Sequence, residues 1–479
     1  FQFSFLSLAI SKKYKLNTII LSDQKKNSLI INIYKKLGYT NFIKGYSFIK
    51  ILYKPFMLFN SLIYFFYSII KTYFNGFDWF INKFKINNIK IGDLIYDTNI
   101  RYQQRFIKPK IDLYFLKLLL TSIFRFFIIK EYIENYNVKK LVIGTETGSR
   151  NHGIALRISS KLNIKNYTYS RIGKYGLSLI SHKKDYLLRG IETITKKEFL
   201  KISKNISIKK INNFYNKRKK NKTSNWYTMK DYKIANLYNK KSDTFINFLS
   251  NKTKTKILFA SHAFADAPHA SGQFIFNDYF DQFMKTFNFA CNDDQNLWIF
   301  KPHPNSRILD EKKIFKKQFM NNKKNNILLC PDNIPIQKLL DTCDVVITGR
   351  GTIGMEFAAL GKKAIIAGSA PYSDLNIVFQ ARSKKEYFNF LKNIKELTKS
   401  KDTKQIKKIS RQLIYILENC LHHKKITNDE LSKDKNYVNC LKIITKKNLA
   451  LKVMFKNFDI ISKNNILKSA VYKKLLEIV

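Results

Sequence analysis

Between Lys256 and Ile394, short apolar runs alternate with segments of helical character. Apolar runs of four to six residues bounded by turn residues are typical of buried strands in a parallel sheet. The predicted strands are Lys256–Ser261, Leu297–Lys301, Asn326–Leu329, Asp344–Thr348 and Lys363–Ala367, and the predicted helices are Gln273–Ala290, Pro335–Thr342 and Thr352–Leu360. This alternation predicts an α/β domain in which helices pack against a parallel sheet.

The N-terminal half shows the same alternation less regularly. Apolar runs of strand length occur at residues 17–22, 40–43, 139–144 and 166–170, with helical segments at 26–37 and 150–162. The chain begins inside a helical segment, so we expect a first strand to lie upstream of it. The order favours a second parallel, doubly wound sheet.

Residues 204–255 are rich in Lys and Asn and show no clear period, which indicates a linker or insertion. We therefore predict an N-terminal Rossmann-like domain (1–203), this linker (204–255), a C-terminal Rossmann-like domain (256–400) and a helical tail (401–479). A chain of 479 residues is long enough for more than one core.

The chain is strongly basic. Lys and Arg number 87 against 34 Asp and Glu, a formal net charge of +53. A charge of this size indicates an anionic partner such as a membrane surface, a phosphate-bearing substrate or nucleic acid. The competing interpretation is base composition, because Lys, Asn, Ile, Phe and Tyr all have AT-rich codons and are abundant throughout the chain.

Cysteine usage and the apolar segments indicate where in the cell the protein acts. The five cysteines form no CxxC pair and are odd in number, which argues against a disulfide framework or a zinc site and favours the cytoplasm. Pro55–Ile70 carries no charged residue but is shorter than the ~20 residues that span a bilayer. We expect this segment and Leu113–Ile133 to form helices that are either buried in the core or lie at a membrane interface.

The strongest motif is DVVITGRGTIGMEFAALG at 344–361, an apolar strand that leads through a glycine-rich turn into a helix. Glycines allow a ligand to approach the backbone, and free N–H groups at a helix start attract phosphate. We predict that the turn binds a nucleotide phosphate and that Glu356, one helical turn on, accepts hydrogen bonds from ribose. The phosphate-binding candidates are Gly349, Arg350, Gly351 and Thr352. The alternative is a structural turn without a ligand.

The second motif is WIFKPHPN at 298–305, in which Pro302 and Pro304 bracket His303 at the end of an apolar strand. Ligands of open α/β sheets bind beyond the carboxyl ends of strands. His303 is placed there to stabilise charge on a departing phosphate, with Lys301 adding positive charge beside it. A structural histidine is the alternative.

KPHP followed by GTIGMEFAALGKKAIIAG resembles capsule and surface-polysaccharide biosynthesis proteins of the GT-B class. That group includes bacterial Kdo transferases, sialyltransferases and the glycerophosphotransferases of teichoic-acid synthesis. In these proteins an HP motif and a Ser/Thr-rich helix start bind the phosphate of CMP- or CDP-activated donors. The resemblance implies this role for His303, Pro304 and Thr352. Arg350–Gly351 departs from the pattern, which often has a second hydroxyl residue, and leaves the donor open.

Candidates for acid–base chemistry follow other strand ends. FASHAFADAPHASG at 259–272 places Asp266 and His269 on one loop, where the carboxylate would act as general base and the histidine would tune it. On the N-terminal side the candidates are Asp97 and Glu146. Two further residues are expected on the acceptor side: Arg101 and Arg150. A purely structural role is the alternative for each.

These observations predict two Rossmann-like domains facing a cleft, a GT-B arrangement, and a glycosyltransferase or polyol-phosphate transferase acting on a capsule or other surface polysaccharide. No Asp-x-Asp triplet and no Walker motif occur, so we expect neither a metal nor another cofactor, and no ATPase. The predicted partners are a nucleotide sugar, a lipid-linked or polymeric glycan acceptor and an anionic membrane surface, at the inner face of the cytoplasmic membrane; nucleic acid is not expected.

Two rivals stay open. One is a nucleotide-sugar 2-epimerase of the same architecture, although epimerases normally carry His-Arg where this chain has Lys-Pro-His-Pro. The other is a non-enzymatic basic protein that binds membrane or nucleic acid, which predicts Lys and Arg concentrated on one face.

Overall fold

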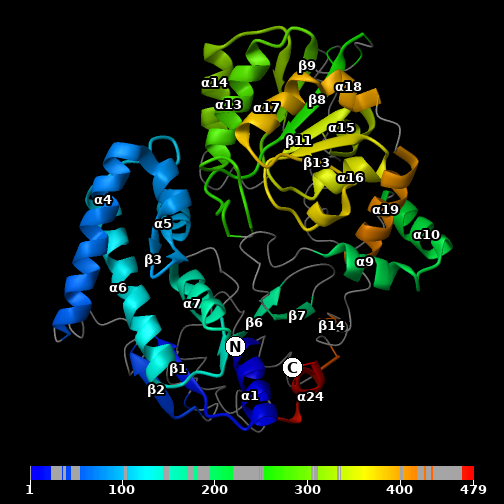
Figure 1. The fold of residues 1–479 in the computed structure, drawn as a ribbon. Helices are drawn as coiled ribbons and strands as arrows, with labels where there is room; N and C mark the ends of the chain where they lie inside the picture. The colour runs from blue at the N-terminus through cyan, green and yellow to red at the C-terminus, as the bar shows by residue number, and fades with distance from the viewer. Residues whose placement is uncertain are drawn as a thin grey trace, which may run out of the picture.

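The computed structural model describes residues 2–22, 35, 39–44, 54–101, 105–143, 150–170, 176–181, 194–219, 248, 250, 253–270, 272–303, 306, 311–331, 334, 336–399, 403–417, 425–427, 433–434 and 467–478. A six-stranded sheet with its helices forms one part of the molecule, at the top in Figure 1. Helices α4, α5 and α6 lie at the left, and α1 and α24 lie side by side at the bottom.

The six-stranded sheet is entirely parallel, with the order β10-β9-β8-β11-β12-β13. Along the chain this is 3-2-1-4-5-6, the doubly wound order of Rossmann-type sheets, in which ligands bind where the order reverses. The reversal lies between β8 and β11. Its strands are β8 (Thr255–Ala260), β9 (Asn296–Lys301), β10 (Ile327–Leu329), β11 (Val345–Thr348), β12 (Lys363–Ile366) and β13 (Phe379–Gln380). The predicted α/β class is confirmed, and the first five strands agree with the predicted ones to within a residue or so.

The sheet is buried on both faces because successive side chains point in opposite directions. Phe259 and Phe300 contact helices on one face, while Leu258 and Ile299 contact helices on the other. The first face is covered by α13 (Tyr279–Cys291), α14 (Glu311–Asn321) and α17 (Lys384–Lys392), and the second by α15 (Ile336–Thr342) and α16 (Ile353–Ala359). Helix α18 (Ile394–Lys399) follows α17.

The predicted start of the helix at Gln273 is wrong. Helix α13 begins six residues later, because the side chain of Asp278 accepts a hydrogen bond from the backbone N–H of Asp281 at 2.7 Å and caps the helix there. The residues before it form an isolated bridge between Phe274 and Gly368.

The N-terminal half departs from the predicted all-parallel sheet. A four-stranded sheet has the order β14-β7-β6-β5, in which only β5 and β6 are parallel. A separate parallel pair joins β1 (Ile19–Ser22) and β2 (Asn41–Lys44), and a short hairpin joins β3 (Lys85–Ile86) and β4 (Ile89–Lys90). The other strands are β5 (Lys140–Val142), β6 (Lys165–Ser170) and β7 (Gly176–Ser181), and the helices include α7 (Arg150–Lys161), α9 (Lys196–Ser203) and α10 (Ile208–Lys219). Most of the helix expected at 26–37 lies outside the described residues.

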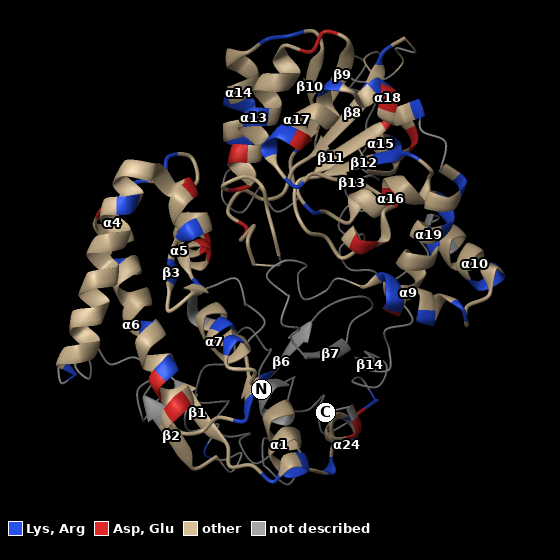
Figure 2. Ribbon diagram, in the orientation of Figure 1, with Lys and Arg blue, Asp and Glu red and all other residues tan. Residues whose placement is uncertain are grey.

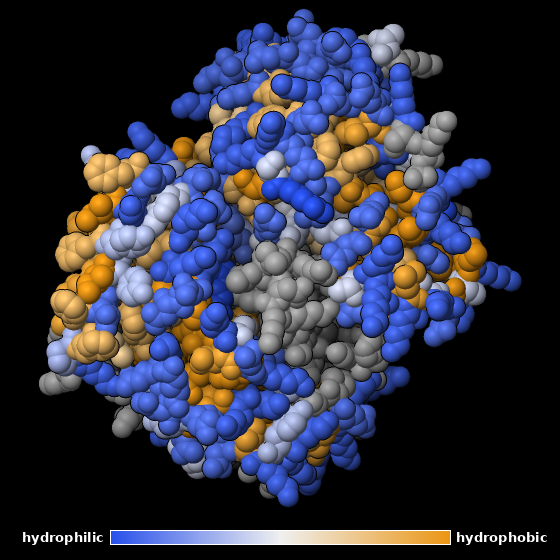
Figure 3. All heavy atoms as spheres, in the orientation of Figure 1, coloured by the Kyte–Doolittle hydropathy of each residue, from blue (hydrophilic) through white to orange (hydrophobic). Residues whose placement is uncertain are grey.

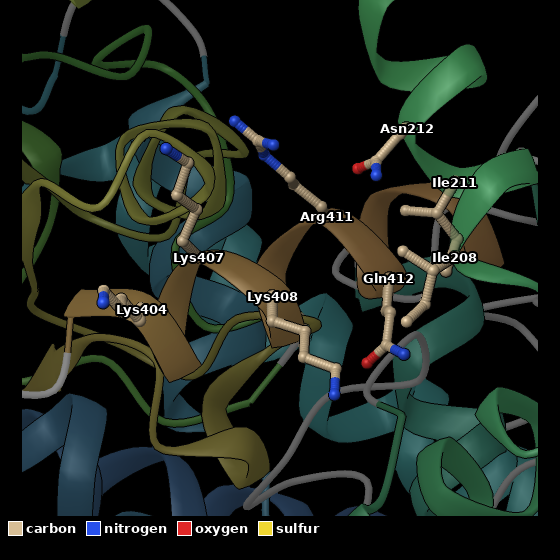
Figure 4. A pocket seen from close by; sticks show the side chains of 8 residues that line it. All are labelled: Ile208, Ile211, Asn212, Lys404, Lys407, Lys408, Arg411 and Gln412. Carbon is tan, nitrogen blue, oxygen red and sulfur yellow. The ribbon is translucent and has the colours of Figure 1, made fainter.

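The C-terminal tail is not wholly helical, because it contributes a strand to the N-terminal sheet. Helix α19 (Thr403–Tyr415) packs against α16, and β14 (Lys425–Thr427) then pairs antiparallel with β7. Helix α24 (Ala470–Ile478) contacts α1 (Gln2–Tyr14). Between α10 and α19 lies a cavity of about 200 Å³ with a basic lining (Figure 4). The tail therefore returns from the six-stranded sheet to the N-terminal half.

Helix α4 (Pro55–Lys83) packs against α6 (Leu113–Asn135) and α5 (Gly92–Ile100). Its other face exposes a line of apolar side chains, the α4 stripe: Phe56, Phe59, Leu62, Ile63, Phe66, Tyr67, Ile70, Tyr73 and Phe74. Figure 3 shows this stripe as apolar surface along the left edge of the molecule. Burial of the 55–70 segment in the core was one predicted alternative. It holds for one face of the helix, where Tyr64, Phe65 and Ile69 pack against the core, and not for the exposed stripe. No helix of the described residues is long and apolar enough to cross a membrane.

Candidate functional site

Three chain segments meet at the carboxyl ends of β8, β9 and β11. They are residues 261–270 after β8, Pro302 and His303 after β9, and residues 349–352 after β11. Because β8 and β11 are neighbours at the reversal of strand order, this edge is where open sheets of this kind bind ligands. We call the region bordered by the three segments the crevice. The two motifs predicted to bind phosphate therefore lie at one edge of one sheet.

His262 stands at the centre of this crevice. Its ring stacks on Tyr279, with centroids 4.4 Å apart, and lies nearly parallel to the ring of His303 at 6.2 Å. Its Nε2 accepts a hydrogen bond from the backbone N–H of Arg350 at 3.2 Å. Burial lowers the pKa of His262 to about 3, and the positive charges of His303 and Arg350 act in the same direction. His262 is therefore neutral, with its proton on Nδ1.

Arg350 connects the glycine-rich turn to the loop after β8. Its Nε donates to the carbonyl of Ser369 at 3.0 Å, and its Nη1 donates to the carbonyl of Pro268 at 3.0 Å. Pro268 lies between Asp266 and His269. The guanidinium that was predicted to bind donor phosphate thus supports the loop that carries the acid–base candidates.

The glycines of the turn make room for side chains of the protein itself. A Cβ on Gly349 would lie 2.7 Å from the Tyr279 ring and 3.1 Å from His262, and one on Gly354 would lie 2.5 Å from the Tyr372 hydroxyl. That hydroxyl donates to the carbonyl of Gly351. These contacts give the glycines a packing role that the sequence did not reveal.

Thr352 is exposed, and its side chain makes no capping hydrogen bond to α16. Glu356 is half-buried on the first turn of the same helix. Lys301 at the end of β9 donates its ammonium to the carbonyl of Ile334 at 3.0 Å. Pro304 lies outside the described residues.

Asp266 lies on the loop that follows β8 and is exposed. Partial desolvation by the surrounding loops raises its pKa, while the positive charges of His303 and Arg101 oppose the rise. The charge of Arg101 reaches it from the end of α5. Asp266, His303 and Arg101 are therefore brought together although they come from three distant parts of the sequence.

His269 pairs with Asp97 of α5, whereas the sequence suggested Asp266 as its partner. Its Nδ1 lies 2.7 Å from Asp97 Oδ1, and its backbone N–H donates to Asp97 Oδ2 at 3.0 Å. Asp97 is fully buried; burial raises its pKa, and the interactions with His269 partly offset the rise. One position earlier in the chain, the hydroxyl of Tyr96 donates to Asp278 at 2.6 Å. Helix α5 thus joins the N-terminal half to the six-stranded part.

Glu311 is a member of the site region that no motif indicated. It is fully buried at the start of α14, and its Oε1 accepts from the backbone N–H of Ala265 at 3.1 Å. Burial raises its pKa, although the N–H groups of Phe264 and Ala265 work against the rise. An acidic residue in the first turn of a helix is too common a pattern to signal this contact.

The remaining candidates are placed only in part. Glu146 lies outside the described residues. Arg150 is the first residue of α7, and its side chain is not among those described. Within the described parts of the chain, no three His, Cys, Asp or Glu side chains group as metal ligands.

Comparison with known proteins agrees with the motifs. Residues 176–405 match the family model described as "Capsule polysaccharide biosynthesis protein". No curated protein sequence matches the chain.

Several solved structures resemble parts of the chain at low similarity. The beta Kdo 2,4 transferase of Thermosulfurimonas dismutans KpsC is 12% identical, covers 57% of this chain and 79% of its own, and has a TM-score of 0.28. The beta Kdo 2,7 transferase of the same protein is 10% identical over 67% and 95%, with a TM-score of 0.33. A glycosyltransferase from Rickettsia africae is 14% identical over 72% and 80%, with a TM-score of 0.30. TM-scores this low add nothing to what the strand order shows.

The family match covers β7, the whole six-stranded sheet and the crevice beside it. The predicted resemblance to capsule polysaccharide biosynthesis proteins is thereby confirmed over residues 176–405.

Proposed function

We propose that the protein is a glycosyltransferase, or a polyol-phosphate transferase, that moves a nucleotide-activated group onto a capsule or other surface polysaccharide without a metal ion. The observation that carries the proposal is the meeting of His303, His262 and the 349–352 turn at the reversal of strand order. The family match supports the biological setting. The donor nucleotide, CMP or CDP by resemblance, occupies the crevice.

The chemistry needs one group to take a proton and others to offset charge. The hydroxyl oxygen of the acceptor bonds to the transferred carbon or phosphorus, while the bond from that atom to the leaving phosphate oxygen breaks. Asp266 takes the hydroxyl proton, since its raised pKa favours proton uptake. His303 and the exposed hydroxyl of Thr352 donate hydrogen bonds to the leaving phosphate, where negative charge grows. Lys301 adds positive charge at the same strand end.

Substitution of His303 tests this assignment. His303→Ala is expected to lower the transfer rate by about 10²–10³, the usual cost of one electrostatic donor. Its melting temperature should stay near that of the wild type, because His303 lies in the crevice and is only half-buried. Transfer from CMP- and CDP-activated donors is measured against melting temperature and nucleotide-induced thermal shift. Unchanged transfer in His303→Ala contradicts the role, and conversion of a nucleotide sugar without acceptor identifies an epimerase instead.

The same proposal places the protein at the inner face of the cytoplasmic membrane through the α4 stripe. Phe59, Phe66 and Tyr73 follow one another at intervals of seven residues and are 63%, 56% and 76% exposed. A helix with one apolar face lies in the interface plane rather than across the bilayer. Lys and Arg occur on helices of both halves rather than on one face (Figure 2), which favours a general attraction to anionic lipid over a nucleic-acid groove.

Flotation with anionic vesicles tests the membrane location. Wild-type protein is expected to float at low salt and to stay partly bound at ~0.5 M salt, where charge attraction is screened. A triple change, Phe59→Ser, Phe66→Ser and Tyr73→Ser, should remove the salt-resistant fraction. The matched control changes three scattered exposed residues: Tyr136→Ser, Leu200→Ser and Met320→Ser. No flotation of the wild type at low salt contradicts the proposal.

A further inference from the structure

A cavity of about 810 Å³ lies between the two halves of the molecule, with His269 in its lining. On the N-terminal side it is lined by the β3–β4 hairpin, the start of α5 and the end of α7. On the other side it is lined by residues 269–275 and by Arg382 and Ser383. A volume of this size is typical of sites for small organic ligands.

The lining of the cavity is strongly basic. The basic side chains come from both halves: Lys85, Lys90, Arg157, Lys161 and Arg382. Asp93 is the one acidic residue among the described residues of the lining. It is held by Arg157, whose Nη2 donates to Asp93 Oδ2 at 3.0 Å, and by Lys90 at 3.3 Å. Burial would raise the pKa of Asp93, but the two positive charges outweigh it and lower the pKa. The remaining positive charge makes the cavity suited to an anion.

His269 supplies a second, independent indication of a ligand. It lines the cavity, is only 4% exposed, and is fixed through Nδ1 by Asp97. Its Nε2 is buried and has no hydrogen-bond partner in the part of the chain that the structure describes. Buried polar atoms without a partner are rare in native proteins, and a bound ligand is a usual reason for them.

The cavity and the crevice share helix α5. Asp93 near its first turn faces the cavity, Asp97 in its middle holds His269, and Arg101 at its end acts on Asp266. A chain of sugars that passes His269 would therefore run from the basic cavity towards the proposed general base.

We propose that this cavity binds a carboxylate- or phosphate-bearing sugar unit of the acceptor, with Lys161 and Arg382 contacting the anionic group and His269 Nε2 hydrogen-bonding to the glycan. The lining of the cavity alone supports the binding of an anionic sugar. The assignment of that sugar to the acceptor rests on the proposed transferase function.

Calorimetric titration with defined probes tests the site. The probes are two acidic trisaccharides, trigalacturonate and a sialic-acid trimer, the neutral maltotriose, and inorganic phosphate. At least one acidic trimer is expected to bind at least about tenfold more tightly than maltotriose and phosphate, because it satisfies both charge and hydrogen bonding. Equal binding of maltotriose, equal binding of phosphate, or failure of both acidic trimers overturns the proposal.

Variants locate the binding. Lys161→Glu combined with Arg382→Glu should weaken acidic-trimer binding at least about tenfold. Lys404→Glu combined with Lys408→Glu makes the same change in net charge at the small α10–α19 cavity and should leave binding unchanged. His269→Asn keeps a side-chain N–H for Asp97 and removes Nε2, so it should also weaken binding. If the first pair lowers the melting temperature, Lys161→Gln with Arg382→Gln replaces it. Equal effects of cavity and control pairs contradict the site.

Nucleotide binding separates this proposal from the transferase function. CDP-induced thermal shift is expected to be the same in the Lys161 and Arg382 variants as in the wild type, since neither residue lies in the crevice. Absence of any nucleotide binding by the wild type would refute the proposed function and leave the titration result intact.

Discussion

The six-stranded sheet and helix α4 are both rich in apolar side chains, but the sheet buries them and α4 exposes many of them. All four residues of β11 and of β12 are buried, whereas α4 turns a line of large apolar residues to solvent. A contiguous exposed patch of this kind marks an interaction surface. The comparison separates apolar residues that hold the fold from apolar residues that serve a partner, a distinction that hydropathy alone does not make.

Truncation of one aromatic residue in each region gives the largest expected contrast. Phe300→Ala should lower the free energy of unfolding by about 3–5 kcal/mol, because Phe300 is fully buried against Phe259, Phe287 and Phe319. Phe66→Ala in the α4 stripe should change it by no more than about 0.5 kcal/mol. Urea unfolding measures both. Comparable losses of stability in the two variants would contradict the contrast, because they would show that the exposed face of α4 is packed in solution.

The N-terminal half nevertheless has a fully buried ion pair, and removing one partner tests how firmly it is packed. Asp93→Asn should cost about 3–5 kcal/mol, because the buried Arg157 loses its counter-charge. Glu134→Gln, which removes an exposed pair with Lys130 on α6, should cost about 0.5 kcal/mol or less.

The pH dependence of the Asp93 contribution has a definite sign. The folded-state pKa of Asp93 is below its usual value, so the contribution is present above pH ~4 and is lost as pH falls through the folded-state pKa. A cost for Asp93→Asn that does not shrink at low pH would contradict this.

Asp278 behaves in the opposite way at the junction of the two halves. Burial raises the pKa of Asp278 to about 6, so between pH ~4 and 6 the folded state binds a proton that the unfolded state does not. Its ionisation therefore costs stability as pH rises, by about 2–3 kcal/mol in all. Asp278→Asn should remove this part of the pH profile, measured by urea unfolding between pH 4.5 and 7.5. An unchanged profile would show that the Tyr96–Asp278 contact is open to water.

The smallest effect on stability is expected at the proposed phosphate site. Thr352→Ala should change the free energy of unfolding by no more than about 0.5 kcal/mol, because the side chain is exposed and caps nothing. The same variant should weaken the thermal shift induced by CMP or CDP. A loss of stability without a loss of nucleotide binding would give Thr352 a structural role like that of the buried sheet residues.

The sequence predicts what is encoded locally. Five strands of the six-stranded sheet are predicted because each is a short apolar run between turns, whereas the two-residue β13 is too short to give such a signal. The crevice is predicted because two motifs follow such strands. The pairing of Asp97 with His269 has no local signal, since the two residues are separated by 172 positions. The same holds for β14, whose pairing with β7 decides that the N-terminal sheet is mixed. The exposure of the α4 stripe could not be predicted either. An apolar helical segment has the same sequence pattern whether it packs in a core or against a membrane.

The hydrogen bonds from α5 also limit how such a protein can diversify. Tyr96 and Asp97 bind residues 182 and 172 positions further along the chain, in the loop that precedes α13. If the half that contains the six-stranded sheet were exchanged for that of a relative with a different loop, Asp97 would remain buried without either of its bonds. A viable chimera therefore has to inherit α5 together with the sheet, so the natural unit of recombination is larger than the segment that binds the donor.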